Sequence, residues 1–196
     1  CLVKTDVCGF FNSTDLKMIA GKVGGTAEIF PFILGHEGIG KVVEVGNKVK
    51  NYQLGDMVAD PTLRFEAGSP YAVMCGQFAE YTIVQDLPVM EELGITDKAF
   101  RAHCSQRIAP GFSPADAVIL LTFKETLSAL NNFGFEAGMD VLLYGDGPVG
   151  LALTSLMRLR GAKWIGAVGH WDDRLEKIAT LGKADVVVNE KKGGLD

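Results

Sequence analysis

The sequence predicts an α/β protein with a β-rich first part and a second part in which strands and helices alternate. Short runs in the first part, such as "GKVVEVGNKV" at residues 40–49, alternate apolar and polar positions, and glycines lie between these runs. Many short strands with frequent glycine turns are typical of a barrel. From residue 140 onward, three short apolar runs alternate with two helical patterns, which is the order of a parallel β-α-β-α-β unit.

The first part shows strand patterns from its first residue. "CLVKTDVCGF" has the pattern of a strand already under way and the chain does not begin with Met, so we expect a piece of a longer protein. Further strands are expected at residues 40–49, 52–60 and 76–84. The pattern changes near Ser113. We expect a domain of residues 1–121, whose first strands are missing, and a second domain of residues 122–196.

Cap and turn residues mark the elements of the second part. Ser113 is a candidate N-cap with Pro114 at the first helical position, and Gly134 is a candidate helix stop. Strands are expected at residues 140–144, 164–168 and 185–188, and helices at 151–160 and 172–181. The first of these strands is apolar in the manner of a strand buried in a parallel sheet. We interpret Asp172 and Asp173 as caps of the last helix.

Composition and charge exclude several classes of protein. The 196 residues are 47% hydrophobic, which is enough for a core, and their net charge of −5 comes without a basic cluster, so we expect no nucleic-acid partner. No apolar run has membrane length, so we expect no membrane partner, and no leader peptide is visible. The four cysteines are scattered without a disulfide framework, which favours a reducing compartment, the cytoplasm.

A glycine-rich turn connects the first strand of the second part to its helix. The turn reads Gly145-Asp146-Gly147-Pro148-Val149-Gly150, and a predicted strand before it and a predicted helix after it give the context of a dinucleotide-binding turn. Gly145 would make the tight turn, Gly147 would let the backbone approach a pyrophosphate, and Gly150 would let helix and strand pack closely. The helix N-terminus would then bind the phosphates, and Asp146 would have to point outward or be solvated. A turn without a ligand is the alternative.

The following strand ends at Gly169, where an acidic residue would bind the ribose 2′-hydroxyl of NAD(H). A glycine there leaves room for a 2′-phosphate, and His170 or Arg174 could supply positive charge, so the sequence favours NADP(H) over NAD(H). For His170, an exposed loop histidine is the alternative. Trp171 could stack on an adenine or cover the edge of the sheet, and we favour cover.

A histidine and a glutamate lie side by side between glycines in the first part. The spacing Gly35-His36-Glu37-x-x-Gly40-x5-Gly46-x-x-Val49 matches the zinc-type motif of the medium-chain dehydrogenase/reductase family, so the chain resembles that family. "DLKMIAG" before this stretch, and "LGDMVADP" and "GDGPVG" after it, occur in the family's order, so the resemblance covers essentially the whole chain. It implies a GroES-like β-barrel domain followed by a Rossmann domain, with substrate in the cleft between them.

The resemblance also implies roles for individual residues. His36 matches the family's zinc-ligand histidine, and Glu37 matches a glutamate that binds the metal in some members and only supports a ligand in others. Asp15 matches the acid that orients the ligand histidine, and Thr14 matches the hydroxyl that relays the substrate proton. A turn or helix cap in "STDLKM" is an equally good local interpretation of Thr14 and Asp15.

Two zinc-ligand positions of the family are changed in this chain. The first falls on Asn12, and Cys8 could replace it only if the loop bends differently. The third falls on Leu121, which cannot bind metal, and Glu125 is the nearest acid. Catalytic zinc needs three protein ligands, so the retention of zinc stays open. Candidate ligands are His36, Glu37 and Cys8. Without zinc, His36 would be a core histidine or a hydrogen-bond donor to substrate.

The resemblance implies an NAD(P)-dependent oxidoreductase that transfers a hydride between a nicotinamide and an alcohol, polyol or sugar carbon, with zinc polarising the oxygen where it is present. The expected partner is a small alcohol or carbonyl substrate, and the full-length protein is expected to form a homo-oligomer. A zinc-free NADPH-dependent quinone or enone reductase and a truncated, non-catalytic dinucleotide-binding module are the alternatives. The chain stops after the third Rossmann strand, so we expect an incomplete domain with an unpaired sheet edge, inactive by itself.

Overall fold

The computed structural model describes residues 1–11, 13–23, 31–65, 68–99 and 102–193. The chain divides into two compact units, Cys1–Val118 and Ile119–Asp196. Within the described ranges, no helix is long and apolar enough to cross a membrane.

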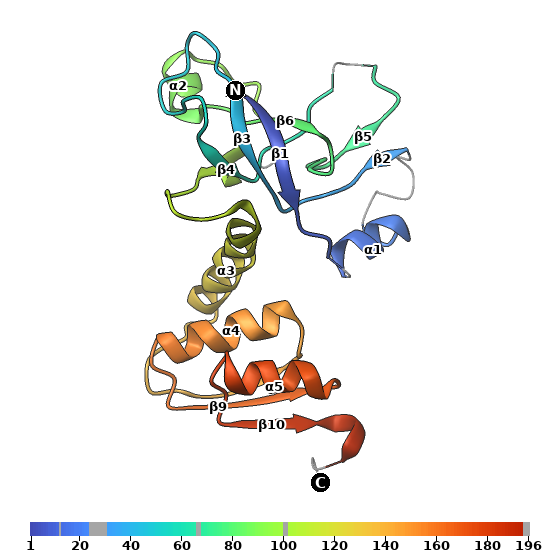
Figure 1. Ribbon diagram of the computed structural model, residues 1–196, viewed down its shortest axis with the longest axis vertical. Helices are drawn as coiled ribbons and strands as arrows, with labels where there is room; N and C mark the ends of the chain where they lie inside the picture. Colours follow the sequence, from blue (N-terminus) through green and yellow to red (C-terminus); the bar gives the residue numbers. More distant parts are fainter. Residues whose placement is uncertain (12, 24–30, 66–67, 100–101, 194–196) are drawn as a thin grey trace. The chain divides into compact units, whose positions relative to one another are not determined.

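The first unit is built on an antiparallel sheet with the strand order β6-β1-β3-β4-β7. Its strands are β1 (Leu2–Cys8), β3 (Gly38–Glu44), β4 (Met57–Ala59), β6 (Tyr81–Ile83) and β7 (Gln106–Arg107). The two long strands, β1 and β3, run side by side (Figure 1). A small parallel pair is formed by β2 (Phe32–Ile33) and β5 (Ala72–Val73). The expected strands of the first part are therefore confirmed, although several are shorter than the sequence pattern predicts.

One face of this sheet carries the core of the first unit. Val3, Val42, Val58 and Val84 form a buried cluster. Gly40 lies where β1 and β3 approach closely, because a Cβ at this position would lie 2.5 Å from the carbonyl oxygen of Lys4. Helices α1 (Thr14–Ile19) and α2 (Leu87–Glu92) and the 3₁₀ turn η2 (Ala102–Cys104) complete the unit.

The long helix α3 (Pro114–Asn132) has the caps that the sequence predicts. The Ser113 hydroxyl accepts a hydrogen bond from the Asp116 N–H at 3.1 Å and donates one to the Asp116 carboxylate at 2.6 Å. At the other end, Gly134 has φ +69°, and the Phe135 N–H donates to the Leu130 carbonyl at 3.0 Å. This is a Schellman motif, in which glycine supplies the left-handed residue that ends the helix.

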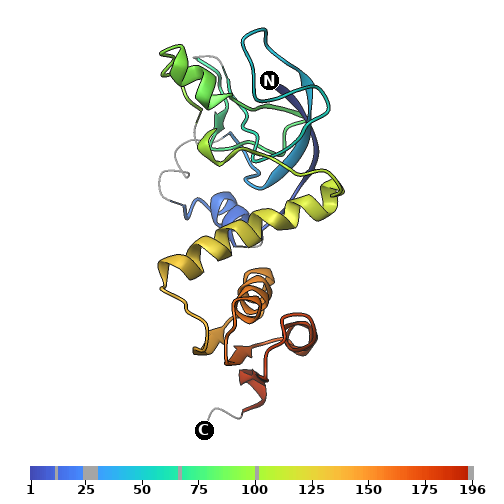
Figure 2. The same ribbon diagram turned by 90° about the vertical axis from the view of Figure 1, so that its left-hand side faces the viewer.

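The second unit contains a parallel three-stranded sheet with the order β10-β9-β8. Its elements are β8 (Asp140–Tyr144), α4 (Pro148–Leu159), β9 (Trp164–Gly169), α5 (Asp172–Thr180), β10 (Val186–Asn189) and the 3₁₀ turn η3 (Glu190–Lys192). Both α4 and α5 lie on the same face of the sheet (Figures 1 and 2). Leu130, Phe135, Met157, Ala162 and Ile165 form the buried core of this unit. The expected β-α-β-α-β order is confirmed.

The other face of this sheet is largely bare. Leu142 is 61% exposed and Tyr144 is 65% exposed, and Trp164 and Val186 on the neighbouring strands are also exposed. The expectation that β8 is a fully buried strand is therefore wrong. Its residues alternate between exposed and half-buried, because helices cover one face only and β8 lies at the edge of the sheet.

Candidate active site

A buried histidine–carboxylate pair lies at the end of β1. His36 precedes β3, Asp15 lies in the first turn of α1, and His36 Nδ1 is 3.1 Å from Asp15 Oδ1. Asp15 is fully buried and His36 is 7% exposed. Gly35, directly before the histidine, has φ +93°, and a Cβ at this position would lie 2.5 Å from the backbone nitrogen of Phe78, so only glycine fits here. The contact fixes the imidazole and leaves Nε2 as the nitrogen that can face a ligand.

Asp15 also holds the loop that follows β1. Its Oδ2 accepts a hydrogen bond from the Phe11 N–H at 2.7 Å, and its own N–H donates to the Phe11 carbonyl at 3.1 Å. The Asp15 side chain therefore binds the loop and His36, and the N-cap position of α1 belongs to Ser13. Of the two interpretations in the sequence, orientation of the histidine describes this side chain better than helix capping. Thr14 is the half-buried first residue of α1, next to Asp15.

Cys8 lies beside the backbone of the histidine and the glutamate because β1 pairs with β3. Cys8 is the last residue of β1 and is paired with Gly38, and the Gly9 N–H donates to the Glu37 carbonyl at 2.8 Å. Burial raises the pKa of the Cys8 thiol to about 12, and the nearby Asp15 and Glu37 carboxylates act in the same direction. The thiol donates weakly to the Gly9 carbonyl at 3.7 Å. Cys8 is therefore a protonated thiol beside the backbone of His36 and Glu37.

The fit of this region to zinc is incomplete. The carboxylate–histidine contact is the arrangement that supports metal-bound histidines in proteins. Nevertheless, no three His, Cys, Asp or Glu side chains in the described part of the chain converge to hold a metal ion. Asn12 lies outside the described residues, and Leu121 and Glu125 belong to the second unit. These residues therefore do not form a complete set of zinc ligands in the described structure.

The ring of Phe11 lies against the histidine, and the sequence patterns did not single out this residue or the aromatic pair Phe10 and Phe78. The rings of Phe11 and His36 are 5.3 Å apart. The rings of Phe10 and Phe78 are stacked at 6.4 Å, and both are exposed. Their signal in the sequence was the run "GFF" directly after a strand, two consecutive large apolar residues in a loop. Phe11 thus gives His36 an aromatic neighbour, and Phe10 and Phe78 form an exposed aromatic pair on the first unit.

The glycine turn of the second unit has the geometry of a phosphate-binding turn. Gly145 follows β8 with φ +127°, and Gly147 is the N-cap of α4 with open space where a Cβ would lie. A Cβ on Gly150 would lie 2.2 Å from the Gly145 carbonyl oxygen, so only glycine allows this packing. Pro148 opens the helix and Val149 is exposed. The backbone is thus accessible at the N-terminus of α4, where a pyrophosphate would bind.

Asp146 takes an unexpected position within this turn. Its Oδ2 accepts hydrogen bonds from the backbone N–H groups of His170 and Trp171, both at 2.7 Å. A Cβ on Gly169 would lie 2.5 Å from the Cβ of Asp146. The space expected beside Gly169 for a 2′-phosphate is therefore filled by Asp146. Partial burial disfavours the charged carboxyl, but the two N–H groups and Arg174 outweigh this effect and hold the pKa of Asp146 below its usual value.

Several cationic side chains after β9 have partners in the described structure. His170 pairs with Glu190. Lys191 Nζ lies 4.1 Å from the centroid of the Trp171 ring, which is 52% exposed. Arg174 lies over the same ring at 6.0 Å.

The expected capping role of the acids at the start of α5 is wrong. The N-cap of α5 is Trp171, and Asp172 and Asp173 lie within the first helical turn. Asp172 instead accepts hydrogen bonds from Asn189 at 2.8 Å and from Lys192 at 2.6 Å. Asn189 at the end of β10 and Lys192 in η3 therefore bind this carboxylate. These are long-range contacts, which local sequence spacing does not reveal.

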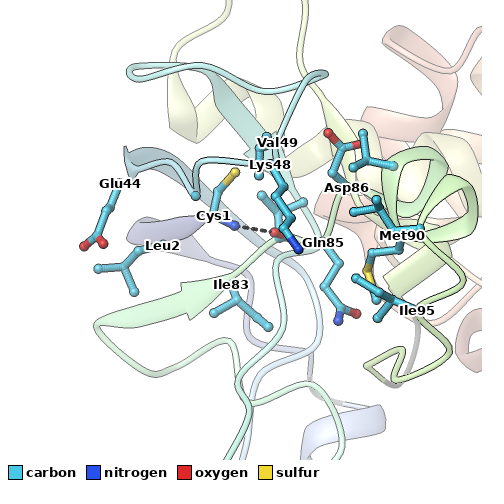
Figure 3. A pocket seen from close by; sticks show the side chains of 14 residues that line it. Cys1, Leu2, Glu44, Lys48, Val49, Ile83, Gln85, Asp86, Met90 and Ile95 are labelled. Atoms are coloured by element: carbon cyan, nitrogen blue, oxygen red, sulfur yellow. Dashed lines mark hydrogen bonds between the residues drawn. The ribbon is translucent and has the colours of Figure 1, made fainter.

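A pocket of about 470 Å³ lies at the opposite end of β1 from Cys8. Figure 3 shows the apolar and polar side chains that line it, among them Leu2, Ile83, Met90 and Ile95. The amine of Cys1 donates to the Val84 carbonyl at its edge, at 2.8 Å. This pocket contains neither His36 nor Asp15.

A barrel unit with a buried histidine–carboxylate pair, joined to a βαβαβ unit with a phosphate-binding turn, defines the alcohol dehydrogenase-like class of proteins. Residues 1–91 match the alcohol dehydrogenase GroES-like domain. This match and the relatives described next show that the chain is similar to the zinc-type alcohol and polyol dehydrogenases of the medium-chain dehydrogenase/reductase family. The expected fold class, a GroES-like barrel followed by part of a Rossmann domain, is confirmed.

The relatives extend over nearly the whole chain. D-xylulose reductase of Scheffersomyces stipitis is 27% identical over 208 residues, covering 97% of this chain and 54% of that protein. NADP-dependent isopropanol dehydrogenase of Thermoanaerobacter brockii is 30% identical, covering 88% of this chain and 51% of that protein. Among solved structures, 2R,3R-butanediol dehydrogenase from Bacillus subtilis has a TM-score of 0.69 at 26% identity, covering 98% of this chain and 56% of that one. The chain spans about half the length of the curated relatives it matches.

Proposed function

We propose that the protein is an NAD(P)-dependent oxidoreductase that transfers a hydride between a nicotinamide cofactor and an alcohol, polyol or sugar carbon. The observation that carries the proposal is the buried His36–Asp15 pair in the same chain as a glycine turn with an accessible helix N-terminus. The relatives include a D-xylulose reductase and an NADP-dependent isopropanol dehydrogenase, which supports this reaction class.

The dinucleotide fits the second unit. The open space at Gly147 and the free N–H groups at the start of α4 would hold its pyrophosphate, and the bound nicotinamide supplies the hydride chemistry. In the first unit, the Asp15 carboxylate would keep a proton on His36 Nδ1, so that Nε2 is the nitrogen presented to a ligand. The Thr14 hydroxyl would relay the proton of the substrate. The rings of Phe10 and Phe11 would limit the access of water.

Whether zinc assists the hydride transfer is a separate part of the proposal, and it can be measured. Metal analysis of the full-length protein decides it: about one tightly bound zinc per chain would mean that residues around His36 assemble a ligand set on binding the metal. A metal-free protein that still turns over substrate would remove zinc from the proposal and leave the hydride transfer intact.

The reaction is tested with the full-length protein by following NADH or NADPH absorbance with a panel of alcohols, polyols and sugars. We expect turnover that His36→Asn reduces at least tenfold, because the ring nitrogen that faces the ligand is lost. His103→Asn is the matched control, since His103 lies in the exposed turn η2 and should leave the rate unchanged. Absence of turnover with every substrate in the panel, in protein that binds no dinucleotide, would refute the proposal.

The proposal also covers the location of the protein in the cell and its oligomeric state. We propose a cytoplasmic location, which the four free cysteines support, and a homo-oligomeric full-length protein. Mass measurement in solution and fractionation of the source cells test these two points.

A further inference from the structure

The carboxylate of Asp146 lies where a dinucleotide-binding fold usually has its ribose-binding acid. That acid normally extends from the end of the second strand, about 20 residues after the glycine turn, and binds the ribose 2′-hydroxyl. Here the strand ends at Gly169, and a Cβ built on it would lie 2.5 Å from Asp146 Cβ and 2.8 Å from Asp146 Oδ2. The Asp146 side chain thus enters the volume that an acid at residue 169 would enter.

We propose that Asp146 supplies the ribose-binding carboxylate from the glycine turn and makes the protein prefer NAD(H) over NADP(H). This inference rests on the proposed function, because it specifies which nicotinamide dinucleotide the same site takes. It reverses the preference that Gly169 alone suggests.

The hydrogen bonds of Asp146 explain why a 2′-phosphate would be disfavoured. The backbone N–H groups of His170 and Trp171, the two residues after Gly169, both already donate to Asp146 Oδ2. They favour the ionised carboxylate, so a negative charge is fixed beside the position of the ribose. A ribose 2′-hydroxyl can donate to this carboxylate, whereas the dianionic 2′-phosphate would be repelled by it.

The nearby cations do not offset this repulsion in the structure. His170 is paired with Glu190, and Lys192 is paired with Asp172. Arg174 contributes to the low pKa of Asp146, and both Arg174 and Lys191 lie over the ring of Trp171. A 2′-phosphate would therefore have to draw these groups away from existing partners.

The test measures binding to the full-length protein by isothermal titration calorimetry, with NAD⁺, NADP⁺, 5′-AMP and 2′,5′-ADP as ligands. We expect NAD⁺ to bind more tightly than NADP⁺, and 5′-AMP more tightly than 2′,5′-ADP, each by about tenfold or more. Asp146→Asn keeps an oxygen acceptor for both backbone N–H groups and removes the charge, so the ratio should shift toward NADP⁺ by about tenfold. Asp140→Asn is the matched control, because it removes an acid paired with Lys163 at the start of β8, the end of the strand away from the glycine turn, and should leave the ratio unchanged.

A second variant separates ribose binding from a purely structural role. In the double variant Asp146→Gly with Gly169→Asp, the acid moves to the usual position and the close contact between the two side chains disappears. We expect this variant to recover the NAD⁺ preference. Tighter binding of NADP⁺ by the unmodified protein, or an unchanged ratio in Asp146→Asn, would overturn the inference and leave Asp146 as a brace of the turn. A protein that binds none of the four ligands would instead refute the proposed function, and this inference with it.

Discussion

Asp15 and His36, which are 21 positions apart in the sequence, are joined by a buried contact of 3.1 Å between Oδ1 and Nδ1. The second carboxylate oxygen of Asp15 holds the backbone of Phe11 at 2.7 Å. One side chain therefore fixes both the imidazole and the loop that follows Cys8. The geometry of the candidate site depends on this carboxylate more than on any other described group.

Replacing Asp15 should impair both activity and folding. Asp15→Asn is expected to reduce turnover by about 10- to 100-fold, because the orientation and tautomer of His36 are no longer fixed. Asp15→Ala should also lower the free energy of unfolding by about 1–3 kcal/mol, because the Phe11 N–H and His36 lose their acceptor in a buried site. Turnover assays and urea unfolding measure these effects. Asp6→Asn, on the exposed side of β1, is the control; an equal loss in that variant would contradict the prediction.

Two glycines of the phosphate-binding turn should respond differently to alanine. Gly150→Ala places a Cβ 2.2 Å from the Gly145 carbonyl oxygen, so we expect a destabilised fold, by about 1–3 kcal/mol, and weak dinucleotide binding. Gly147→Ala meets open space in the free protein, so its melting temperature should change little while dinucleotide affinity falls, because the methyl group takes the place of the pyrophosphate. Thermal melting and binding titrations distinguish the two. Equal stability losses would show that Gly147 serves packing.

Asp146 should make a pH-dependent contribution to stability. Its pKa in the folded protein is lower than its usual value near 3.8, so its stabilising effect is complete above that value. The effect is lost as the pH falls through the lower, folded-state pKa. Asp146→Asn should therefore be less stable than the unmodified protein at pH 6, by about 1 kcal/mol or less given the partial exposure of the group. The difference should shrink toward pH 3 in urea unfolding curves. A difference that stays constant with pH would be incompatible with the assigned charge.

The N-terminal cap of α3 should have a measurable effect on stability. Ser113→Ala removes the hydroxyl that binds the Asp116 N–H, and we expect a loss of about 1 kcal/mol in the free energy of unfolding. Ser155→Ala is the matched control, since this hydroxyl only donates to the Leu151 carbonyl within α4, and alanine favours a helix interior. Chemical unfolding of both variants makes the comparison. A larger loss in Ser155→Ala than in Ser113→Ala would contradict the capping role.

Local patterns predicted most of the fold. The cap at Ser113, the stop at Gly134 and the three glycines of the turn depend on neighbouring residues, and the structure has each of these helix ends and turn geometries where the sequence places it. The bounds of β8 and α3 followed for the same reason. The alternation of apolar and polar residues also predicted β1 and β3. These two strands pair with each other along most of their length.

Features that depend on distant residues could not be predicted in this way. The carboxylate of Asp146 is directed by N–H groups 24 and 25 positions away, and nothing within the turn indicates this. Likewise, the spacing before α5 predicts a cap at Asp172, but its partner Lys192 lies beyond the next strand. Cys8 lies beside Glu37 because β1 pairs with β3, a strand that is distant in the sequence. Ion pairs and strand pairings of this kind are set by packing, which local sequence spacing does not encode.

The uncovered side of the sheet in the second unit bears on how the protein behaves in solution. Four apolar side chains on this face are exposed to water: Leu142, Tyr144, Trp164 and Val186. In the described structure, the edge of the same sheet at β8 also has unpaired backbone groups. Such a surface binds hydrophobic fluorescent dyes and self-associates as the protein concentration rises. We therefore expect the 196-residue protein to sediment as a single species only at low concentration. A mild detergent that covers these four side chains should have the same effect at higher concentration.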